Sequence, residues 1–266
     1  SVVIPVFETP DNYLREMLDS LLNQTYPYFE ICIADGSRAE KDKEKLLREY
    51  SEKDSRVRYR ILGENLGIAG NTNAALDMAE GDFIVLCDHD DVVPETALYE
   101  FVDAIAKDPE CDCIYSDEDK LDVDGGGIFD PHFKPDFNID LLRSVNYICH
   151  LFAFRRELIS SGRVGKFSPE YDGAQDYDFI FRITENSRSI KHVPKILYHW
   201  RCHMNSTASN PESKLYAFEA GARAIRAHYE RVHPEIKIES IEKGEDYGIY
   251  HTFFKLDEEP LVSVVI

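Results

Sequence analysis

The first half of the chain alternates short apolar segments with longer amphipathic ones, and this alternation strongly constrains the fold. Apolar segments at residues 1–6, 30–34, 56–62 and 82–87 are typical of β-strands. The last of them is nearly continuous, as expected for a strand that is buried on both faces. Strands that alternate with helices form parallel sheets with right-handed crossovers. The sequence therefore predicts an α/β fold with a mostly parallel central sheet flanked by helices.

The segments between these strands have the spacing of helices. Leucine and methionine residues between positions 14 and 22 fall on one helical face, with Thr9 predicted as the N-cap and Pro10 in the first turn. Three further helices are predicted, at residues 39–53, at residues 69–79 and from Pro94 onward.

The second half of the chain mixes predicted strands and helices without a simple order. Residues 117–127 are acidic and rich in glycine, which predicts a loop, and Pro194 predicts an edge or a bend in its strand. The predicted strands lie at residues 113–116, 146–155, 190–198, 236–241 and 250–255, the last two as a pair, and the predicted helices at 175–184 and 212–231. This mixed part is where we expect the binding site of a second substrate, called the acceptor below.

Composition excludes several classes of protein. Fifty acidic and thirty basic residues give a net charge of −20, which argues against a nucleic-acid partner. No apolar run approaches the ~18 residues that a membrane-spanning helix needs. Three of the six cysteines, Cys32, Cys87 and Cys149, lie in or beside apolar segments, where cysteine behaves as a small hydrophobic residue. We expect a reduced, cytosolic chain.

The sequence DHDD at residues 88–91 directly follows the most buried predicted strand. Three carboxylates this close repel one another unless a cation neutralises them, and Mg²⁺ or Mn²⁺ shared with substrate phosphates does so in many proteins. The alternative is a turn that caps the next helix. Because ligands of parallel sheets bind at the carboxyl ends of the strands, we expect a metal here.

Two further strand ends carry polar residues. Asp35 is followed by Gly36 and Ser37, which forms a plain turn or places Asp35 against a nucleobase or ribose. Residues 65–73 bridge a strand and a helix with two glycines, which permits close approach of the backbone to a phosphate or ribose. A helix-capping loop is the alternative, and the dinucleotide-binding spacing of glycines is absent from this loop.

Two polar motifs lie in the second half of the chain. In the sequence QDYD at residues 175–178, one of Asp176 and Asp178 is a candidate general base, and the other caps the helix or pairs with Arg182. In the sequence YHWR at residues 198–201, His199 is a candidate ligand for a metal or diphosphate, or a half-buried structural residue. Residues that line an acceptor cleft, or only a solvated loop, are Asp117, Glu118, Asp119, Lys120, His132, Lys134 and Asp136.

Taken in order, six motifs in residues 1–205 resemble the family 2 glycosyltransferases of bacteria, which have the GT-A fold. The likeness is greatest to those that build O-antigen of lipopolysaccharide, capsule or other surface polysaccharide. The motifs are SVVIPVF at residues 1–7, LNQTYP at 22–27, DHDD at 88–91, YSDEDK at 115–120, QDYD at 175–178 and YHWR at 198–201.

The resemblance implies inverting transfer of a sugar from a nucleotide-diphosphate sugar, with UDP- or dTDP-sugars expected, to a saccharide or lipid-linked saccharide. Asp176 matches the catalytic base of the family. Residues implied at the nucleotide sugar are Pro5, Val6, Glu8, Asp35, Asn65, Gly67, Asn73 and Asp88. Asp90, with His199, would hold Mn²⁺ or Mg²⁺, and Asp117, Glu118, Asp119 and Lys134 would face the acceptor.

The sequence departs from the family pattern at two positions: Gln175 replaces a glutamate before the base, and Gly36 replaces an acidic residue. Two other functions stay open. One is a non-catalytic module that binds glycan or nucleotide. The other is a sugar-nucleotide pyrophosphorylase, which would need a basic loop after the first strand, whereas residues 5–11 contain no basic residue. The serine-hydrolase elbow, the HExxH zinc motif and the Walker loop are absent from the sequence.

The sequence SVVI occurs twice, at residues 1–4 and 263–266. We expect a transferase domain at residues 1–232, with a nucleotide-binding half to about residue 115 and an acceptor half from 116. Residues 233–266 would be an extension or linker that ends in the first strand of a second, similar domain. From the family and the absent leader sequence, we expect the protein to lie in the cytoplasm, at the inner face of the bacterial membrane.

Overall fold

The computed structural model describes residues 1–41, 43–123, 127–202, 215–246, 248–258 and 261–265. The strands are β1 (Val2–Val6), β2 (Ile31–Asp35), β3 (Val57–Ile61), β4 (Phe83–Leu86), β5 (Cys111–Asp122), β6 (Ile128–His132), β7 (Phe152–Arg155), β8 (Ser189–Cys202), β9 (Ile238–Lys243) and β10 (Tyr250–Phe254). The helices are α1 (Asp11–Leu22), α2 (Glu44–Lys53), α3 (Gly67–Leu76), α4 (Ala97–Lys107), α5 (Ile139–Leu142), α6 (Glu157–Ser160), α7 (Gln175–Glu185) and α8 (Leu215–Val232), with 3₁₀ turns at η1 (Ala39–Lys41) and η2 (Pro169–Tyr171).

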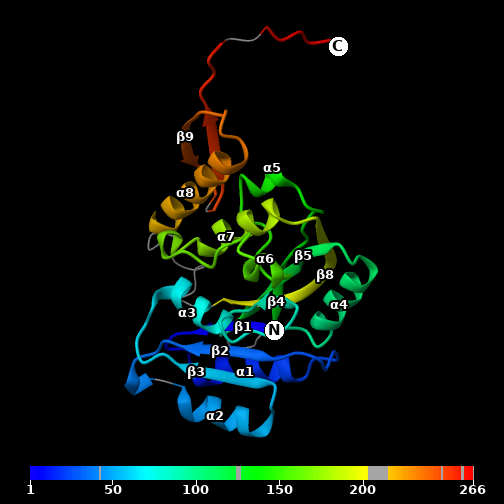
Figure 1. Ribbon diagram of the computed structural model, residues 1–266, viewed down its shortest axis with the longest axis vertical. Helices are drawn as coiled ribbons and strands as arrows, with labels where there is room; N and C mark the ends of the chain where they lie inside the picture. The colour runs from blue at the N-terminus through cyan, green and yellow to red at the C-terminus, as the bar shows by residue number, and fades with distance from the viewer. Residues whose placement is uncertain (42, 124–126, 203–214, 247, 259–260, 266) are drawn as a thin grey trace.

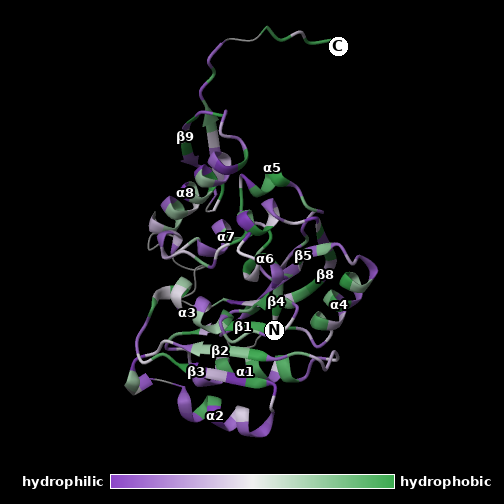
Figure 2. Ribbon diagram, viewed as in Figure 1, coloured by the Kyte–Doolittle hydropathy of each residue, from purple (hydrophilic) through white to green (hydrophobic). Residues whose placement is uncertain are grey.

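The predicted parallel sheet is confirmed in the first half of the chain. β1 pairs in parallel with β2 and β4, and β2 pairs in parallel with β3. Val3 packs into the hydrophobic core on one face of the sheet, while Val2 and Ile4 pack into the core on the other. Burial on both faces explains why these strands read as continuous apolar segments. In Figure 2 the central strands are accordingly hydrophobic and the outer face of α2 is hydrophilic.

The second half extends the same sheet in a mixed manner. The sheet has eight strands in the order β3-β2-β1-β4-β7-β5-β6, and β8 also pairs with β5 (Figure 1). β7 is antiparallel to both β4 and β5. The register of β8 on β5 shifts around Pro194, as that proline predicted. The helix expected from residue 212 begins, within the described residues, at Leu215, and the expected pair β9 and β10 is confirmed as antiparallel.

Four local predictions are wrong. Residues 117–122 are not a loop, because β5 continues through them and pairs with both β6 and β8. The strand expected at 146–155 begins only at Phe152. The hydroxyl of Thr9 does not cap α1 but lies 2.9 Å from His89 Nδ1, and Pro10 is the N-cap residue. The helix expected to open at Pro94 begins at Ala97.

The hairpin of β9 and β10 packs against α8. The ring of Tyr250 in β10 stacks on Phe218 at 4.9 Å, and Ile249 forms an isolated β-bridge with Val145. The segment 261–265 runs away from the rest of the chain (Figure 1).

All six cysteines are free thiols. Within the described residues, no helix combines the length and the apolar character needed to cross a membrane.

Candidate functional site

A cavity of about 360 Å³ lies where the carboxyl ends of β1 and β4 meet the start of α7. Pro5 and Asp88 reach it from the two strands, and Asp176 reaches it from the helix. His150 also lines it, because β7 is antiparallel to β4 and the residues before β7 therefore lie near the end of β4. Parallel sheets bind ligands at this edge, so this cavity is the candidate site.

The acidic residues after β4 are divided between the cavity and the interior. The side chain of Asp88 is 42% exposed and lines the cavity. Asp91 is buried, and its carboxylate accepts hydrogen bonds from the Tyr198 hydroxyl at 2.5 Å and the Arg201 amide at 2.7 Å. Burial, with the nearby charges of Asp88 and Asp90, raises the pKa of Asp91 well above its usual range. Asp91 therefore anchors the loop, and Asp88 is available to a ligand.

Arg201 holds the same loop from the end of β8. Its guanidinium is buried, and Nε donates to the carbonyl of Asp90 at 2.6 Å. A second nitrogen donates to Glu16 at 2.6 Å, and the group lies 4.5 Å from the centre of the Tyr13 ring. The last residue of the motif YHWR thus has a structural role, since it fixes the backbone of the acidic loop.

His150 is a cavity residue that the sequence analysis missed. Its Nε2 atom lies 3.5 Å from Asp88 Oδ2, and its ring stacks on Tyr198 at 5.0 Å. The sequence contains one indirect signal: His150 comes just before an apolar segment, which becomes antiparallel β7. Only the antiparallel pairing brings this position to the end of β4.

Glu118 and Lys134 were expected to face an acceptor, and the structure corrects this for Lys134. The Lys134 side chain has no exposed surface, and its ammonium donates to Glu118 at 3.2 Å and to the carbonyls of Ile148, at 3.1 Å, and His150. Glu118 in turn accepts the amide hydrogen of His150 at 2.6 Å. Burial lowers the pKa of Lys134. The pKa of Glu118, which burial alone would raise, is lowered by its hydrogen bond with His132 and by the charges of Lys134 and His150. The pair therefore fixes the backbone of His150.

Asp117 and Asp119, also expected at the acceptor, are buried in β5. Asp117 accepts the amide hydrogen of Lys134 at 2.9 Å and lies 2.8 Å from His192 Nε2. Asp119 Oδ1 lies 2.5 Å from Nδ1 of His199. Both carboxylates are bound by partners distant in the sequence, and their expected contact with an acceptor stays a prediction.

The structure separates the two acidic residues at the start of α7. Asp176 lines the cavity and accepts a hydrogen bond from the Asn146 side-chain amide at 2.8 Å. Asp178 is buried and pairs with Arg182 at 2.7 Å. Gln175, the departure from the family pattern, accepts the amide hydrogen of Gly173 at 2.9 Å and so orders the residues before the helix. Of the two acids, Asp176 is therefore the candidate base.

Residues after β1 and β2 are mostly used by the protein itself. The carboxylate of Asp35 is fully buried and accepts the amide hydrogens of Ser37, at 2.9 Å, and Lys43, at 2.7 Å. The carbonyl of Val6, also buried, accepts the Gly36 amide hydrogen at 2.9 Å. Glu8 pairs with Arg38 and Lys41, whose hydrogen bonds lower its pKa to about 2. Asp35 thus orders this loop with both its oxygens, which differs from the expected contact with a nucleobase.

The loop before α3 is held in a similar way. Asn65 Oδ1 accepts from the Gly67 amide and from Asn71, both at 3.0 Å, and Gly67 has the positive φ of +77° that favours glycine. Asn73 binds both the amide and the carbonyl of Phe167, at 3.0 and 2.8 Å. The side chain of Asn73 therefore joins α3 to the second half of the chain, and its expected contact with the nucleotide stays a prediction.

The residues at the end of β4 fit a divalent cation that is shared with a substrate. Within the described ranges, no group of three or more His, Cys, Asp or Glu side chains is placed to hold a metal by itself. Mg²⁺, however, commonly binds through one or two carboxylates together with substrate phosphates, and Asp90, the predicted ligand, supplies one such carboxylate. The contact of His199 Nδ1 with Asp119 is the arrangement that typically orients a metal-binding imidazole.

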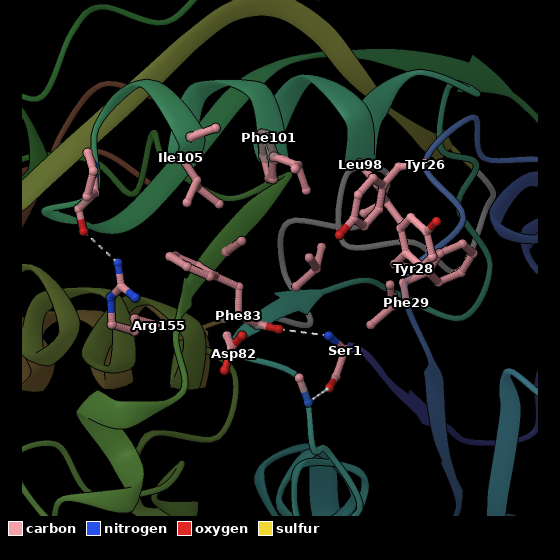
Figure 3. A pocket seen from close by; sticks show the side chains of 17 residues that line it. Ser1, Tyr26, Tyr28, Phe29, Asp82, Phe83, Leu98, Phe101, Ile105 and Arg155 are labelled. Carbon is pink, nitrogen blue, oxygen red and sulfur yellow. Dashed lines mark hydrogen bonds between the residues drawn. The ribbon is translucent and has the colours of Figure 1, made fainter.

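A larger cavity, of about 590 Å³, lies at the opposite edge of the sheet (Figure 3). Ser1 and Phe83 mark the amino ends of β1 and β4 there, and the side chains of Phe101 and Ile105 point toward it from α4. Its Arg155 donates to Asp112 at 2.9 Å. Parallel sheets bind their ligands as a rule at the carboxyl ends of the strands, so the smaller cavity remains the candidate site.

Comparison with known proteins gives two curated relatives that align with the whole chain. The uncharacterized protein y4gI of Sinorhizobium fredii is 38% identical over 268 residues, which are 29% of its length. The O-antigen biosynthesis protein RfbC of Myxococcus xanthus is 32% identical over 266 residues, which are 20% of its length. The chain thus spans less than a third of either relative.

Two solved structures share the fold. TarS residues 1–349 of S. aureus with UDP-GlcNAc has a TM-score of 0.67 at 21% identity, covering 87% of this chain and 66% of that one. The mannosyltransferase PcManGT of Pyrobaculum calidifontis, with GDP-Man and Mn²⁺, has a TM-score of 0.58 at 18% identity, covering 88% and 74%. These likenesses confirm the predicted GT-A fold.

A family model described as "Glycosyl transferase family 2" matches residues 1–162, more than half of the chain. The chain therefore belongs to glycosyl transferase family 2.

Proposed function

We propose that this domain transfers a sugar, with inversion, from a nucleotide-diphosphate sugar to a hydroxyl group of a saccharide or lipid-linked saccharide. The observation that carries the proposal is that Asp88 and Asp176 line one cavity at the carboxyl edge of the sheet. The first residue is suited to the donor side of the reaction and the second to the acceptor side. The O-antigen biosynthesis protein RfbC, a relative by sequence, supports a role in the synthesis of surface polysaccharide.

The donor would occupy the cavity between β1, β4 and α3. Pro5, Thr72 and Asp88 line it from these three elements, which gives the donor a pocket with mixed apolar and polar walls. The buried Asp35 and the loop around Asn65 and Gly67 would act by fixing the backbone near the nucleotide. UDP- and dTDP-sugars remain the expected donors, and the fold is shared with a structure that contains UDP-GlcNAc.

Asp90 would hold the divalent cation, with His199 as a further ligand oriented by Asp119, and Asp88 would contact the ribose or the donor sugar. When bound, Mn²⁺ or Mg²⁺ would stabilise the negative charge that develops on the leaving diphosphate. The presence of Mn²⁺ in the PcManGT structure supports this part of the proposal. Arg201 contributes by fixing the Asp90 backbone, so that the two carboxylates keep their places.

Asp176 would act as the general base. Its carboxylate takes the proton of the acceptor hydroxyl while that oxygen bonds to the anomeric carbon. The bond between this carbon and the diphosphate oxygen breaks, and the bonding electrons leave with the nucleoside diphosphate. A single displacement of this kind inverts the configuration of the anomeric carbon. A positioned base contributes typically ~100- to 10,000-fold to the rate.

The proposal extends to the organisation and place of the whole protein. Residues 1–232 would form the catalytic domain, and the hairpin of β9 and β10 packs on its surface. The repeated SVVI sequence supports a second, similar domain that begins near residue 260. The reaction is proposed at the cytoplasmic face of the bacterial membrane, which follows from the family.

A panel of nucleotide diphosphates tests the donor site. UDP, GDP, dTDP and CDP are each added to the protein with and without Mn²⁺, and the unfolding temperature is measured. A ligand that binds only the native state stabilises it by about 2.7 kcal/mol at a hundred times its dissociation constant. One diphosphate should raise the unfolding temperature in the presence of Mn²⁺, and the Asp88→Asn variant should lose this rise. A panel without any shift would contradict the proposed donor site.

A further inference from the structure

The base Asp176 has a neighbour that the proposed reaction does not yet use. Asn146 lies in the segment between α5 and β7, and its Nδ2 atom donates to Asp176 Oδ2 at 2.8 Å. A hydrogen bond from an amide to a carboxylate is charge-assisted, and it is stronger and more directional than a bond between neutral groups. Because Oδ2 of Asp176 already accepts this hydrogen bond, Oδ1 is the more basic of the two oxygens and the one that would take a proton.

The orientation of the Asn146 amide is fixed by the same contact. Rotating the amide by half a turn would place its carbonyl oxygen against the negatively charged carboxylate. In the observed orientation Oδ1 of Asn146 is buried and, among the described residues, has no hydrogen-bond partner. A buried acceptor without a partner destabilises the folded chain, so keeping the Asn146 amide against Asp176 has a cost in stability. Buried polar groups without a partner are concentrated at functional sites.

The backbone on both sides of Asn146 is anchored. Val145 forms a β-bridge with Ile249, and the hydroxyl of buried Tyr147 accepts the amide hydrogen of Asn138 at 2.8 Å. The neighbour of Asp176 on the helix is held as well, because the Tyr177 hydroxyl donates to the carbonyl of Leu142. Both ends of the contact between Asn146 and Asp176 are therefore attached to rigid parts of the fold.

We propose that Asn146 is a positioning residue that fixes the rotamer of Asp176 and directs its Oδ1 atom toward the acceptor hydroxyl. This inference rests on the proposed function, since it assigns Asn146 a role only through the base. Asn146 does not contact the donor in this account. Its loss therefore lowers the rate of the chemical step and leaves the affinity for the nucleotide unchanged. A misplaced reacting group costs up to about 100-fold in rate.

The test compares Asn146→Ala and Asn146→Asp with the unmodified protein, alone and combined with Asp176→Asn. Asn146→Asp keeps the shape of the side chain but sets a second carboxylate against the base. Asn186→Asp is the matched control, because Asn186 donates its amide to the Arg182 carbonyl at the other end of α7. The measurements are kcat and KM for the donor, the dissociation constant of the nucleotide diphosphate, and the unfolding temperature.

We expect kcat to fall 10- to 100-fold in both Asn146 variants, at an unchanged nucleotide dissociation constant. We expect no further loss when Asn146→Ala is added to Asp176→Asn, because the residue acts only through the base. Unchanged kcat in Asn146→Ala, or an equal loss with and without the base, would overturn the inference. If Asp176→Asn itself retains full turnover, the proposed function fails instead, which separates the two failures.

Discussion

Nε2 of His150 lies 3.5 Å from Oδ2 of Asp88, although the two residues come from different halves of the chain. Three other residues hold this pair: Tyr198 stacks on the imidazole ring and donates to Asp91, while Glu118 and Lys134 bind the backbone of His150. The proposed donor side of the cavity is therefore organised by packing and hydrogen bonds within the protein itself. Preorganisation of this kind is what an electrostatically demanding reaction requires.

Replacing Lys134 should affect stability rather than acceptor binding. Lys134→Ala leaves the Glu118 carboxylate, whose side chain is 12% exposed, without its ammonium partner. Breaking a buried pair by removing one partner costs about 3–5 kcal/mol, and urea unfolding measures this loss. Lys120→Ala is the control, because its pair with Asp130 is exposed and should contribute at most about 1 kcal/mol. If Lys134→Ala is as stable as the wild type but has a raised KM for the acceptor, Lys134 contacts the acceptor after all.

The pH dependence of stability should contain a contribution from Glu30. Burial alone would raise its pKa, but hydrogen bonds from Ser1, Glu80 and Arg58 lower it from 4.5 to about 2. A carboxylate with a depressed pKa in the folded state stabilises the protein above its unfolded pKa. This contribution is lost as the pH falls from about 4.5 toward 2.

Urea unfolding of the wild type and of Glu30→Gln, at pH 6 and pH 3, measures that contribution. The difference in unfolding free energy between the two proteins should be largest at pH 6 and smaller at pH 3. A difference that does not change with pH would show that Glu30 has no depressed pKa.

A methyl group at Gly221 should detach the C-terminal hairpin from α8. A Cβ atom there would lie 1.9 Å from the Tyr250 hydroxyl oxygen, so Gly221→Ala should cost about 1–3 kcal/mol despite the better helix propensity of alanine. Gly165→Ala is the control, since the nearest atom to its Cβ, on Arg182, would be 3.7 Å away. Thermal unfolding compares the two, and equal stabilities would show that the hairpin does not pack on α8.

The parallel half of the sheet is predictable because its strands are buried on both faces. Val2, Val3 and Ile4 pack into the two cores in turn, which leaves a continuous apolar signal in the sequence. The second half of β5 is not predictable in this way. Asp117 and Asp119 are buried there only because His192 and His199 accompany them from β8. Without these distant partners, an acidic segment is typical of a loop.

The site was predictable where chemistry depends on position at the end of a strand. Asp88 and Asp176, both singled out by their motifs, line the same cavity, while their roles there stay predictions. Asn73 and Lys134 instead form internal contacts, with Phe167 and Glu118. A polar residue that binds a ligand and one that binds the backbone have the same sequence signal, so only the structure separates them. His150 and Asn146 were missed because antiparallel β7 returns their segment to this edge of the sheet.

Replacing each of the two acids in α7 tests the central claim most directly. Nucleotide release from UDP- and dTDP-sugars, with saccharide acceptors, is measured for Asp176→Asn and for Asp178→Asn per folded molecule. Asp176→Asn should lose ~100- to 10,000-fold in turnover while it still binds the nucleotide diphosphate. Asp178→Asn should lose stability, because Asp178 pairs with Arg182 in the interior, and should retain turnover. Full turnover by Asp176→Asn would contradict the account, because the base would then lie elsewhere.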